Sequence, residues 1–184
     1  MQINMNKVDG TSLPETVVRL LIKEKKTATF AESCTGGLLA KKITDIAGAS
    51  ECFECSFVTY SNKKKTKLLG VRPETLQKFG AVSYQTAYEM CEGAKKAADA
   101  DIGIGITGIA GPGGGTKEKP VGLVYLGICT DSVHGVIRLN LNGSRGEIRD
   151  MASNCALEIM RCAMLGEIEK DKDNPMLLNV EFVY

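Results

Sequence analysis

Apolar residues recur with two different spacings along this chain, and segments of the two kinds alternate. Spacings of three to four residues predict helices, which are expected over 12–26, 36–46, 61–69, 73–79, 83–98 and 144–165. Short apolar or alternating runs predict strands, which are expected over 27–31, 54–60, 101–107, 121–130 and 133–141. Strands that alternate with helices are typical of a sheet covered on both faces. The pattern therefore predicts an α/β protein, a three-layer α/β/α sandwich on a mixed, mainly parallel sheet.

Small polar residues mark the ends of several predicted helices. Serine precedes the helical pattern at Ser61, Ser83 and Ser144, where its hydroxyl can accept a hydrogen bond from an N–H group of the first turn. Glycine follows the pattern at Gly70 and Gly80, because a left-handed residue commonly ends a helix. These boundaries are therefore predicted by local chemistry alone.

Composition narrows the class of protein. The chain has 184 residues, of which 43% are hydrophobic and 24% charged, with a net charge of +1. These values are typical of a globular domain and do not indicate a nucleic-acid-binding surface. No apolar run approaches the length of a membrane span, and residues 1–7 lack the pattern of a signal peptide. We expect a cytoplasmic protein with no membrane and no nucleic-acid partner.

The last residues differ from the rest of the chain. We expect residues 1–165 to form one domain and residues 166–184 to form a C-terminal tail. The tail has a charged stretch over 167–173 and an apolar stretch over 176–184. It is either an extra edge strand or a segment that packs on a partner subunit.

Cysteine and histidine give little support for a metal site. The seven cysteines are scattered, and free thiols are the usual state in the cytosol. Cys52 and Cys55 have the spacing of a zinc or redox pair, but no second pair follows. The single histidine, His134, falls in a segment, 131–135, that reads as an exposed hairpin turn. If the chain is a hydrolase, its base is therefore expected to be a lysine or a carboxylate.

The segment over 29–40 carries the strongest chemical signal. A predicted strand ends in a small polar turn that contains Ser33 and Cys34, and a predicted helix follows. A helix N-terminus has unpaired N–H groups and a partial positive charge, which can hold an oxyanion or a phosphate. Ser33 is the candidate nucleophile. Cys34 is the alternative, because a thiol at a helix N-terminus can have a lowered pKa.

A second strand-to-helix corner carries a candidate base. In the sequence YSNKKK, Tyr60 ends a predicted strand and Lys65 lies about one turn into the next helix. Lys65 can act as a base toward a serine if burial lowers its pKa. Lys63 and Lys64 are expected to lie on the solvent-exposed face of this helix.

Glycine-rich segments offer a weaker signal. Residues 103–108 read GIGITG, but the dinucleotide fingerprint should follow a strand and open a helix, whereas these glycines lie within a predicted strand. The loop over 108–116 can wrap an anion or a carbonyl oxygen, or it is a flexible surface turn. Arg145 begins the last helix, where it marks either an anion site or an ordinary capped terminus.

Five ordered motifs together resemble the C-terminal domain of the competence/damage-inducible (CinA) family. They are 31–37 (AESCTGG), 60–65 (YSNKKK), 80–83 (GAVS), 108–115 (GIAGPGGG) and 119–122 (KPVG). The resemblance covers about residues 12–165 and implies a three-layer α/β/α fold. It also implies hydrolysis of nicotinamide mononucleotide to nicotinate mononucleotide and ammonia, in pyridine nucleotide recycling.

The resemblance implies roles for particular residues. Ser33 would be the nucleophile, Lys65 its base, and Tyr60 would support the pair. The implied substrate-binding residues are Thr35, Gly36, Thr107, Gly108, Ala110 and Arg145. The resemblance implies no cofactor, no metal and a homo-oligomer, either a dimer or a trimer. The family has Gly-Asp-Arg where this chain has Gly143-Ser144-Arg145, which puts local contacts in question.

Two other functions remain open from the sequence. The chain could be a catalytically silent nucleotide-sensing module that retains the pocket. It could also be an interaction protein whose apolar tail binds a partner.

Overall fold

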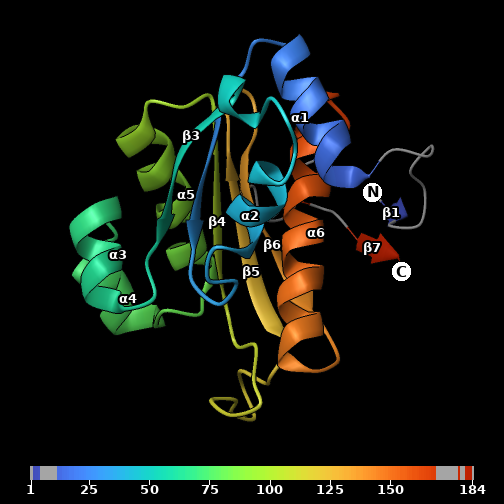
Figure 1. The fold of residues 1–184 in the computed structure, drawn as a ribbon. Helices are drawn as coiled ribbons and strands as arrows, with labels where there is room; N and C mark the ends of the chain where they lie inside the picture. The colour runs from blue at the N-terminus through green and yellow to red at the C-terminus, as the bar shows by residue number, and fades with distance from the viewer. Residues whose placement is uncertain (1, 5–11, 169–177, 179–180, 184) are drawn as a thin grey trace.

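The computed structural model describes residues 2–4, 12–168, 178 and 181–183. Its centre is a five-stranded sheet with the strand order β3-β2-β4-β5-β6 (Figure 1). The strands are β2 (Ala28–Glu32), β3 (Phe53–Val58), β4 (Ile102–Gly108), β5 (Leu123–Cys129) and β6 (His134–Asn140). Strand β2 is parallel to β3 and to β4, whereas β4-β5 and β5-β6 are antiparallel. All strands except β5 therefore point the same way, and the expected mixed sheet is confirmed.

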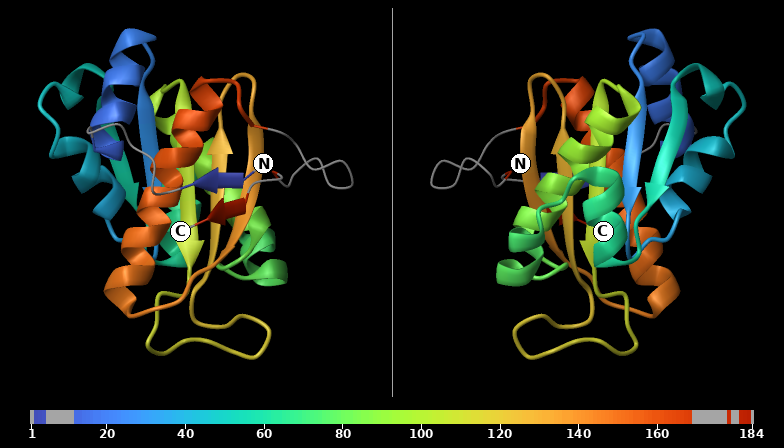
Figure 2. Two further views of the ribbon diagram at one scale, coloured as in Figure 1. Left: turned by 90° about the vertical axis from the view of Figure 1, so that its right-hand side faces the viewer. Right: turned by 90° about the vertical axis from the view of Figure 1, so that its left-hand side faces the viewer.

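Helices cover both faces of this sheet. One face carries α1, α2 and α6, and the other carries α3, α4 and α5 (Figures 1 and 2). The helices are α1 (Leu13–Lys23), α2 (Leu38–Thr44), α3 (Asn62–Leu69), α4 (Pro73–Phe79), α5 (Tyr84–Ala98) and α6 (Arg145–Met164). The predicted α/β class and its three-layer sandwich are confirmed.

Most predicted boundaries agree with the structure because the caps act locally. The hydroxyls of Ser61, Ser83 and Ser144 each accept a hydrogen bond from an N–H group of the first helical turn. Helix α2 is shorter than the predicted 36–46. It begins only at Leu38, because Gly36 and Gly37 adopt positive φ angles of 62° and 92°, which a right-handed helix does not use. A short 3-10 helix, η1 (Ala49–Glu51), follows α2 where the sequence indicated only a stop.

Glycines in the middle of the sheet let α5 pack closely on it. A Cβ atom on Gly105 would lie 2.4 Å from the carbonyl oxygen of Ala87, and one on Gly103 would lie 2.3 Å from that of Cys91. Gly127 of β5 meets Ala87 in the same way, at 2.5 Å. The glycines of the GIGITG segment therefore lie within β4, as predicted, and allow close helix packing in place of dinucleotide binding.

His134 does not lie in the turn where the sequence placed it. It is the first residue of β6, opposite Cys129 of β5, and its side chain is partly buried. The turn itself lies over 130–133, where the Thr130 N–H group donates a hydrogen bond to the Val133 carbonyl oxygen. The placement of this histidine in the turn was therefore wrong, whereas the predicted strand over 133–141 contained it correctly.

The ends of the chain meet outside the main sheet. Strand β1 (Gln2–Asn4) pairs in parallel with β7 (Glu181–Val183) (Figure 1). Leu178 is buried, and its N–H group donates to the carbonyl oxygen of Val136 on the edge strand β6. The rest of the predicted tail, at 169–177, 179–180 and 184, lies outside the described residues.

Within the described ranges, no helix combines the length and the apolar character that crossing a bilayer requires.

Candidate active site

Ser33 and Lys65 meet where the parallel strands end. Ser33 follows the last residue of β2, and Lys65 lies in the first turns of α3. The Lys65 Nζ atom is 2.9 Å from the Ser33 Oγ atom and 2.8 Å from the Thr59 carbonyl oxygen. The structure therefore brings the candidate nucleophile and the candidate base into direct hydrogen-bond contact.

The backbone around Ser33 is held by the two neighbouring strands. The Ser33 N–H group donates to the carbonyl oxygen of Ile106 in β4, at 2.9 Å. The carbonyl oxygen of Glu32 accepts from the N–H group of Thr59, beyond β3, also at 2.9 Å. Because both sides of the corner are hydrogen-bonded, the Ser33 side chain projects from a fixed backbone.

The N-terminus of α2 is already occupied by a buried carboxylate. Glu32, which is fully buried, accepts hydrogen bonds from the N–H groups of Gly37, Leu39 and Ala40 at 2.9–3.1 Å. The sequence predicted that the N–H groups of this terminus are free for an anion, which is wrong for these three. The prediction failed because it considered only the backbone of the turn, whereas the Glu32 side chain, at the end of β2, reaches the first N–H groups of α2.

We expect Glu32→Gln to lower the free energy of unfolding by about 2–3 kcal/mol, since hydrogen bonds to a buried charged group are among the strong ones. An amide has only one oxygen, so its NH2 group would face an N–H donor of the helix. Urea unfolding would measure the loss. Glu54→Gln, on an exposed side chain of β3, is the matched control and should change little. Equal stability of the two variants would show that the Glu32 cap is not stabilising.

Other donors at the corner remain available. Within the part of the chain that the structure describes, the N–H groups of Cys34, Thr35 and Gly36 donate none of the backbone hydrogen bonds. The Thr35 hydroxyl is buried and has no hydrogen-bond partner among the described residues. Backbone N–H groups at such a turn are suited to stabilising an oxyanion beside the nucleophile.

Burial prepares Lys65 to act as a base. The side chain is 1% exposed, and this burial lowers the pKa of Lys65 from 10.5 to about 8, because a charged amine is poorly solvated there. About a tenth of the amine is therefore neutral at pH 7, whereas less than about 0.1% of an ordinary lysine is. Lys63 and Lys64 are exposed, as expected for a solvated face.

The pKa of the Cys34 thiol is raised, whereas the sequence suggested that it could be lowered. The Cys34 side chain is buried, and burial raises the pKa of Cys34 to about 11. The sequence suggested a lowered pKa at a helix N-terminus, but loss of solvation outweighs the effect of the nearby N–H groups and of Lys65. The thiol is protonated at neutral pH, which favours Ser33 as the nucleophile.

Tyr60 contacts Arg145 in place of the Ser33–Lys65 pair. The Tyr60 side chain is 62% exposed, and its hydroxyl accepts a hydrogen bond from the Arg145 Nη2 atom at 3.1 Å. The Arg145 Nη1 atom donates to the carbonyl oxygen of Gly111 at 2.8 Å. The two residues therefore join three segments at the edge of the site: the end of β3, the glycine-rich loop and α6.

The start of α6 is a closed cap. Glu147 accepts hydrogen bonds from the N–H group and the hydroxyl of Ser144, both at 2.7 Å, which completes a capping box. Of the two alternatives that the sequence left open here, the structure therefore shows the capped terminus. The cap also explains the serine at position 144, because serine and aspartate are equivalent at an N-cap. Arg145 remains the cationic group at this position.

The loop between β4 and β5 extends past the same edge of the sheet (Figures 1 and 2). At its base, Ala110 and Thr107 are buried, and the Thr107 hydroxyl donates to the Ala81 carbonyl oxygen at 2.7 Å. Gly108 is required by close strand packing, because a Cβ atom there would lie 2.7 Å from the Leu123 carbonyl oxygen. The base of this loop is therefore closely packed, at the end of the sheet where Ser33 lies.

Two further residues position the site and were not singled out from the sequence. The Arg149 guanidinium donates two hydrogen bonds to the Thr35 carbonyl oxygen, at 2.6 and 3.1 Å, and lies beside Gly36. Lys119 donates from Nζ to the carbonyl oxygens of Phe79 and Val82, at 2.8 and 2.7 Å. Lys119 begins the KPVG motif and Arg149 lies one helical turn after Arg145, but the sequence assigned no role to either residue.

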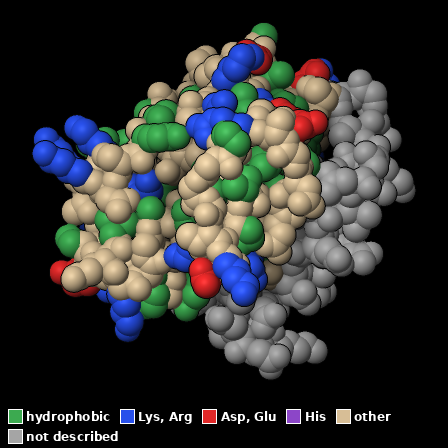
Figure 3. Space-filling model, turned by 90° about the horizontal axis from the view of Figure 1, so that it is seen from below, with side chains coloured by type: hydrophobic (Ala, Val, Ile, Leu, Met, Phe, Trp, Pro, Cys, Tyr) green, Lys and Arg blue, Asp and Glu red, His purple; other side chains and the backbone are tan. Residues whose placement is uncertain are grey.

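The site lies at the end of the sheet where the parallel strands β2 and β3 finish. Seen from this end, the surface is mostly uncharged, with separate groups of Lys and Arg side chains (Figure 3). A cavity of about 800 Å³ lies elsewhere, along α5.

Comparisons with known proteins identify the family of this chain. The family profile described as the CinA C-terminal domain matches residues 10–164. A CinA-like protein from Kosmotoga olearia is 54% identical over 158 residues, which are 86% of this chain and 38% of that protein. A CinA-like protein from Endomicrobium trichonymphae is 50% identical over 159 residues, or 86% of this chain and 37% of that protein. The chain therefore spans about two fifths of the length of these relatives.

Solved structures show the same fold. The competence/damage inducible protein CihA from Agrobacterium tumefaciens is 40% identical, with a TM-score of 0.77, over 86% of this chain and 99% of that one. A CinA superfamily protein from Klebsiella pneumoniae is 33% identical, with a TM-score of 0.81, over 84% and 96% of the two chains.

Proposed function

This chain belongs to the CinA C-terminal domain family, and on that premise we propose that it is a serine amidohydrolase acting on nicotinamide mononucleotide. The observation that carries the proposal is the contact of 2.9 Å between the Ser33 Oγ atom and the Nζ atom of buried Lys65. A serine needs an adjacent base to become a nucleophile. A buried lysine with a pKa of about 8 is suited to that task.

In the proposed first step, neutral Lys65 takes the proton of the Ser33 hydroxyl while Oγ bonds to the carboxamide carbon. The carbonyl oxygen becomes an oxyanion, which N–H groups of the corner can stabilise. Lys65 then returns the proton to the amide nitrogen, the C–N bond breaks and ammonia leaves. An ester to Ser33 remains.

In the second step, water hydrolyses this ester. Lys65 accepts a proton from the water, whose oxygen bonds to the ester carbon, and the Ser33 oxygen leaves with that proton. The products are the original enzyme and a carboxylic acid, which becomes a carboxylate by losing its proton to the solvent. The Thr59 carbonyl oxygen, 2.8 Å from Nζ, keeps the amine pointed at Ser33 throughout.

The nucleotide part of the substrate is expected to lie on the outer edge of the site. Arg145 offers a cation there, and Tyr60 an aromatic ring with a hydroxyl. An arginine suits a phosphate because its guanidinium makes paired hydrogen bonds. We also propose that the protein is cytoplasmic and forms a homo-oligomer.

Ammonia release from nicotinamide mononucleotide by the purified protein tests the proposal. We expect ammonia and nicotinate mononucleotide in equal amounts, with no loss of rate when a chelator is present, because no proposed group acts through a metal. Calorimetry with the same nucleotide is the companion measurement. Nucleotide binding with no ammonia would contradict the amidohydrolase and favour the nucleotide-sensing module.

A further inference from the structure

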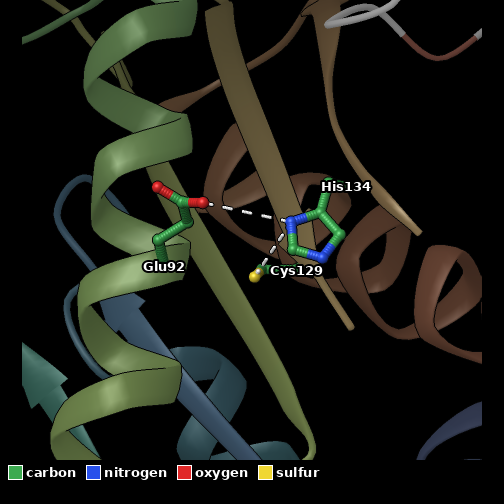
Figure 4. Close-up of side chains that lie close together, drawn as sticks. All are labelled: Glu92, Cys129 and His134. Atoms are coloured by element: carbon green, nitrogen blue, oxygen red, sulfur yellow. Dashed lines mark hydrogen bonds and ion pairs between the residues drawn. The ribbon is translucent and has the colours of Figure 1, made fainter. Parts of the chain in front are cut away.

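Three side chains with metal-binding chemistry converge at the end of the sheet opposite Ser33. Cys129 ends β5, His134 begins β6, and Glu92 lies on α5, which packs over both strands (Figure 4). One ligand atom from each lies within 4.8 Å of the others. Cys129 pairs with Gly103 at the start of β4, whereas the active-site corner adjoins its far end near Gly108. At about 3.3 Å per residue, the two ends are separated by roughly 16 Å.

The spacing of the ligand atoms is close to that of a tetrahedral metal site. The Cys129 Sγ atom is 3.5 Å from the His134 Nδ1 atom. Bond lengths of about 2.3 Å to sulfur and 2.0–2.1 Å to nitrogen, at a tetrahedral angle, place two such ligands about 3.6 Å apart. The Glu92 Oε1 atom is 4.0 Å from the same Nδ1 atom, and a Glu92 carboxylate oxygen lies within 4.8 Å of the Cys129 sulfur, so this exposed side chain would need to move by about 1 Å to bind.

We propose that Glu92, Cys129 and His134 form a zinc-binding site. Thiolate, imidazole and carboxylate are the three side-chain ligands that zinc uses, whereas calcium and magnesium prefer oxygen ligands alone. The pairing across the β5-β6 hairpin holds the thiol and the imidazole side by side before any metal binds. Little reorganisation is therefore needed to form the site.

Three protein ligands leave one position of a tetrahedral zinc ion for water or a ligand. Glu92 and Cys129 line the cavity of about 800 Å³ along α5, so that position would open toward this cavity. Cys129 itself is buried, but Glu92 and His134 are 45% and 40% exposed, which provides an entry path.

The charged and polar groups next to Cys129 affect the affinity of the site for zinc. Lys95 lies near Cys129, but its ammonium is paired with Asp131 at 2.8 Å. The Cys91 thiol lies within hydrogen-bond reach of Cys129, and a hydrogen bond to a metal-bound sulfur is a usual outer-shell contact. Bound zinc would link α5 to the β5-β6 hairpin, and we expect it to raise the melting temperature.

Zinc titration of the purified full chain, by calorimetry with zinc alone, tests the site. We expect one zinc ion per chain and a melting temperature that rises on adding zinc. Cys129→Ser and His134→Gln should each weaken binding by at least about a hundredfold, since even outer-shell changes cost 10- to 100-fold. Glu92→Gln should weaken it by at least about tenfold.

Cys55→Ser is the matched control, because Cys55 is a partly buried cysteine with the spacing of a zinc pair to Cys52. It should leave zinc binding unchanged. His134→Gln decides the question if Cys129→Ser does not fold, because the histidine is partly exposed. No zinc binding by the wild type, binding unaffected by His134→Gln, or binding lost in Cys55→Ser would each overturn the proposal. Ammonia release tests the separate Ser33 site and does not depend on this outcome.

Discussion

Replacing Ser33 by alanine is expected to reduce ammonia release from nicotinamide mononucleotide by at least about a thousandfold, because loss of a catalytic nucleophile removes the covalent route entirely. The Oγ atom is the group that contacts Lys65, at 2.9 Å. The backbone should not move, since the Ser33 N–H group still donates to the Ile106 carbonyl oxygen. Nucleotide binding should therefore remain close to that of the wild type. Ammonia release and calorimetry on the same preparation would separate the two effects.

Cys34→Ala is the control for this variant. Cys34 adjoins Ser33 and is the rival nucleophile, but its burial and its pKa of about 11 keep the thiol protonated. We expect Cys34→Ala to retain most of the wild-type rate. An inactive Cys34→Ala beside an active Ser33→Ala would reverse the assignment of the nucleophile.

Replacing Lys65 by methionine is expected to lower the rate by a similar factor. Among the described residues, Lys65 is the only basic side chain that forms a hydrogen bond with the Ser33 hydroxyl. Lys65→Arg should not rescue activity, since a guanidinium does not lose its proton at accessible pH. Lys64→Met, on an exposed lysine of the same helix, is the matched control and should remain active. Ammonia release would be measured for all three. A Lys65→Arg variant with near wild-type activity would exclude lysine as the base.

The pH dependence gives an independent measure of Lys65. Because the neutral amine is the base, the wild-type rate should rise with pH and level off above a midpoint near the pKa of about 8. A rate that is flat between pH 6 and 10 would contradict this role.

The same shift predicts the direction of the stability change. The pKa of Lys65 is about 8 in the folded protein, whereas a lysine freely exposed to water has a pKa of 10.5, so between these values the unfolded chain binds more protons. Stability therefore rises with pH from 8 to 10.5, and below pH 8 the buried ammonium opposes folding fully. At pH 6, Lys65→Met should be no less stable than the wild type in urea unfolding. Its loss of activity could then be assigned to chemistry.

Local chemistry made much of the fold predictable. Helix α3 begins after Ser61 and ends before Gly70, as predicted, because capping depends only on neighbouring residues. The same reasoning failed at Gly36, since it counted apolar spacing and ignored the positive φ angles of two adjacent glycines. It also placed His134 in a turn, because where a hairpin turns depends on pairing between strands.

The sequence by itself determined the α/β class, the helix caps, the family resemblance and the candidacy of Ser33 and Lys65, because these depend on residue type, spacing and order. Only the tertiary structure decided which side chains meet. Ser33 and Lys65 are 32 residues apart and touch because β2 and β3 pair in parallel. Burial lowers the pKa of Lys65 and raises that of Cys34, and the burial of a single side chain cannot be predicted from its neighbours in the sequence. Packing of α5 on the sheet likewise brought Glu92 to Cys129 and His134.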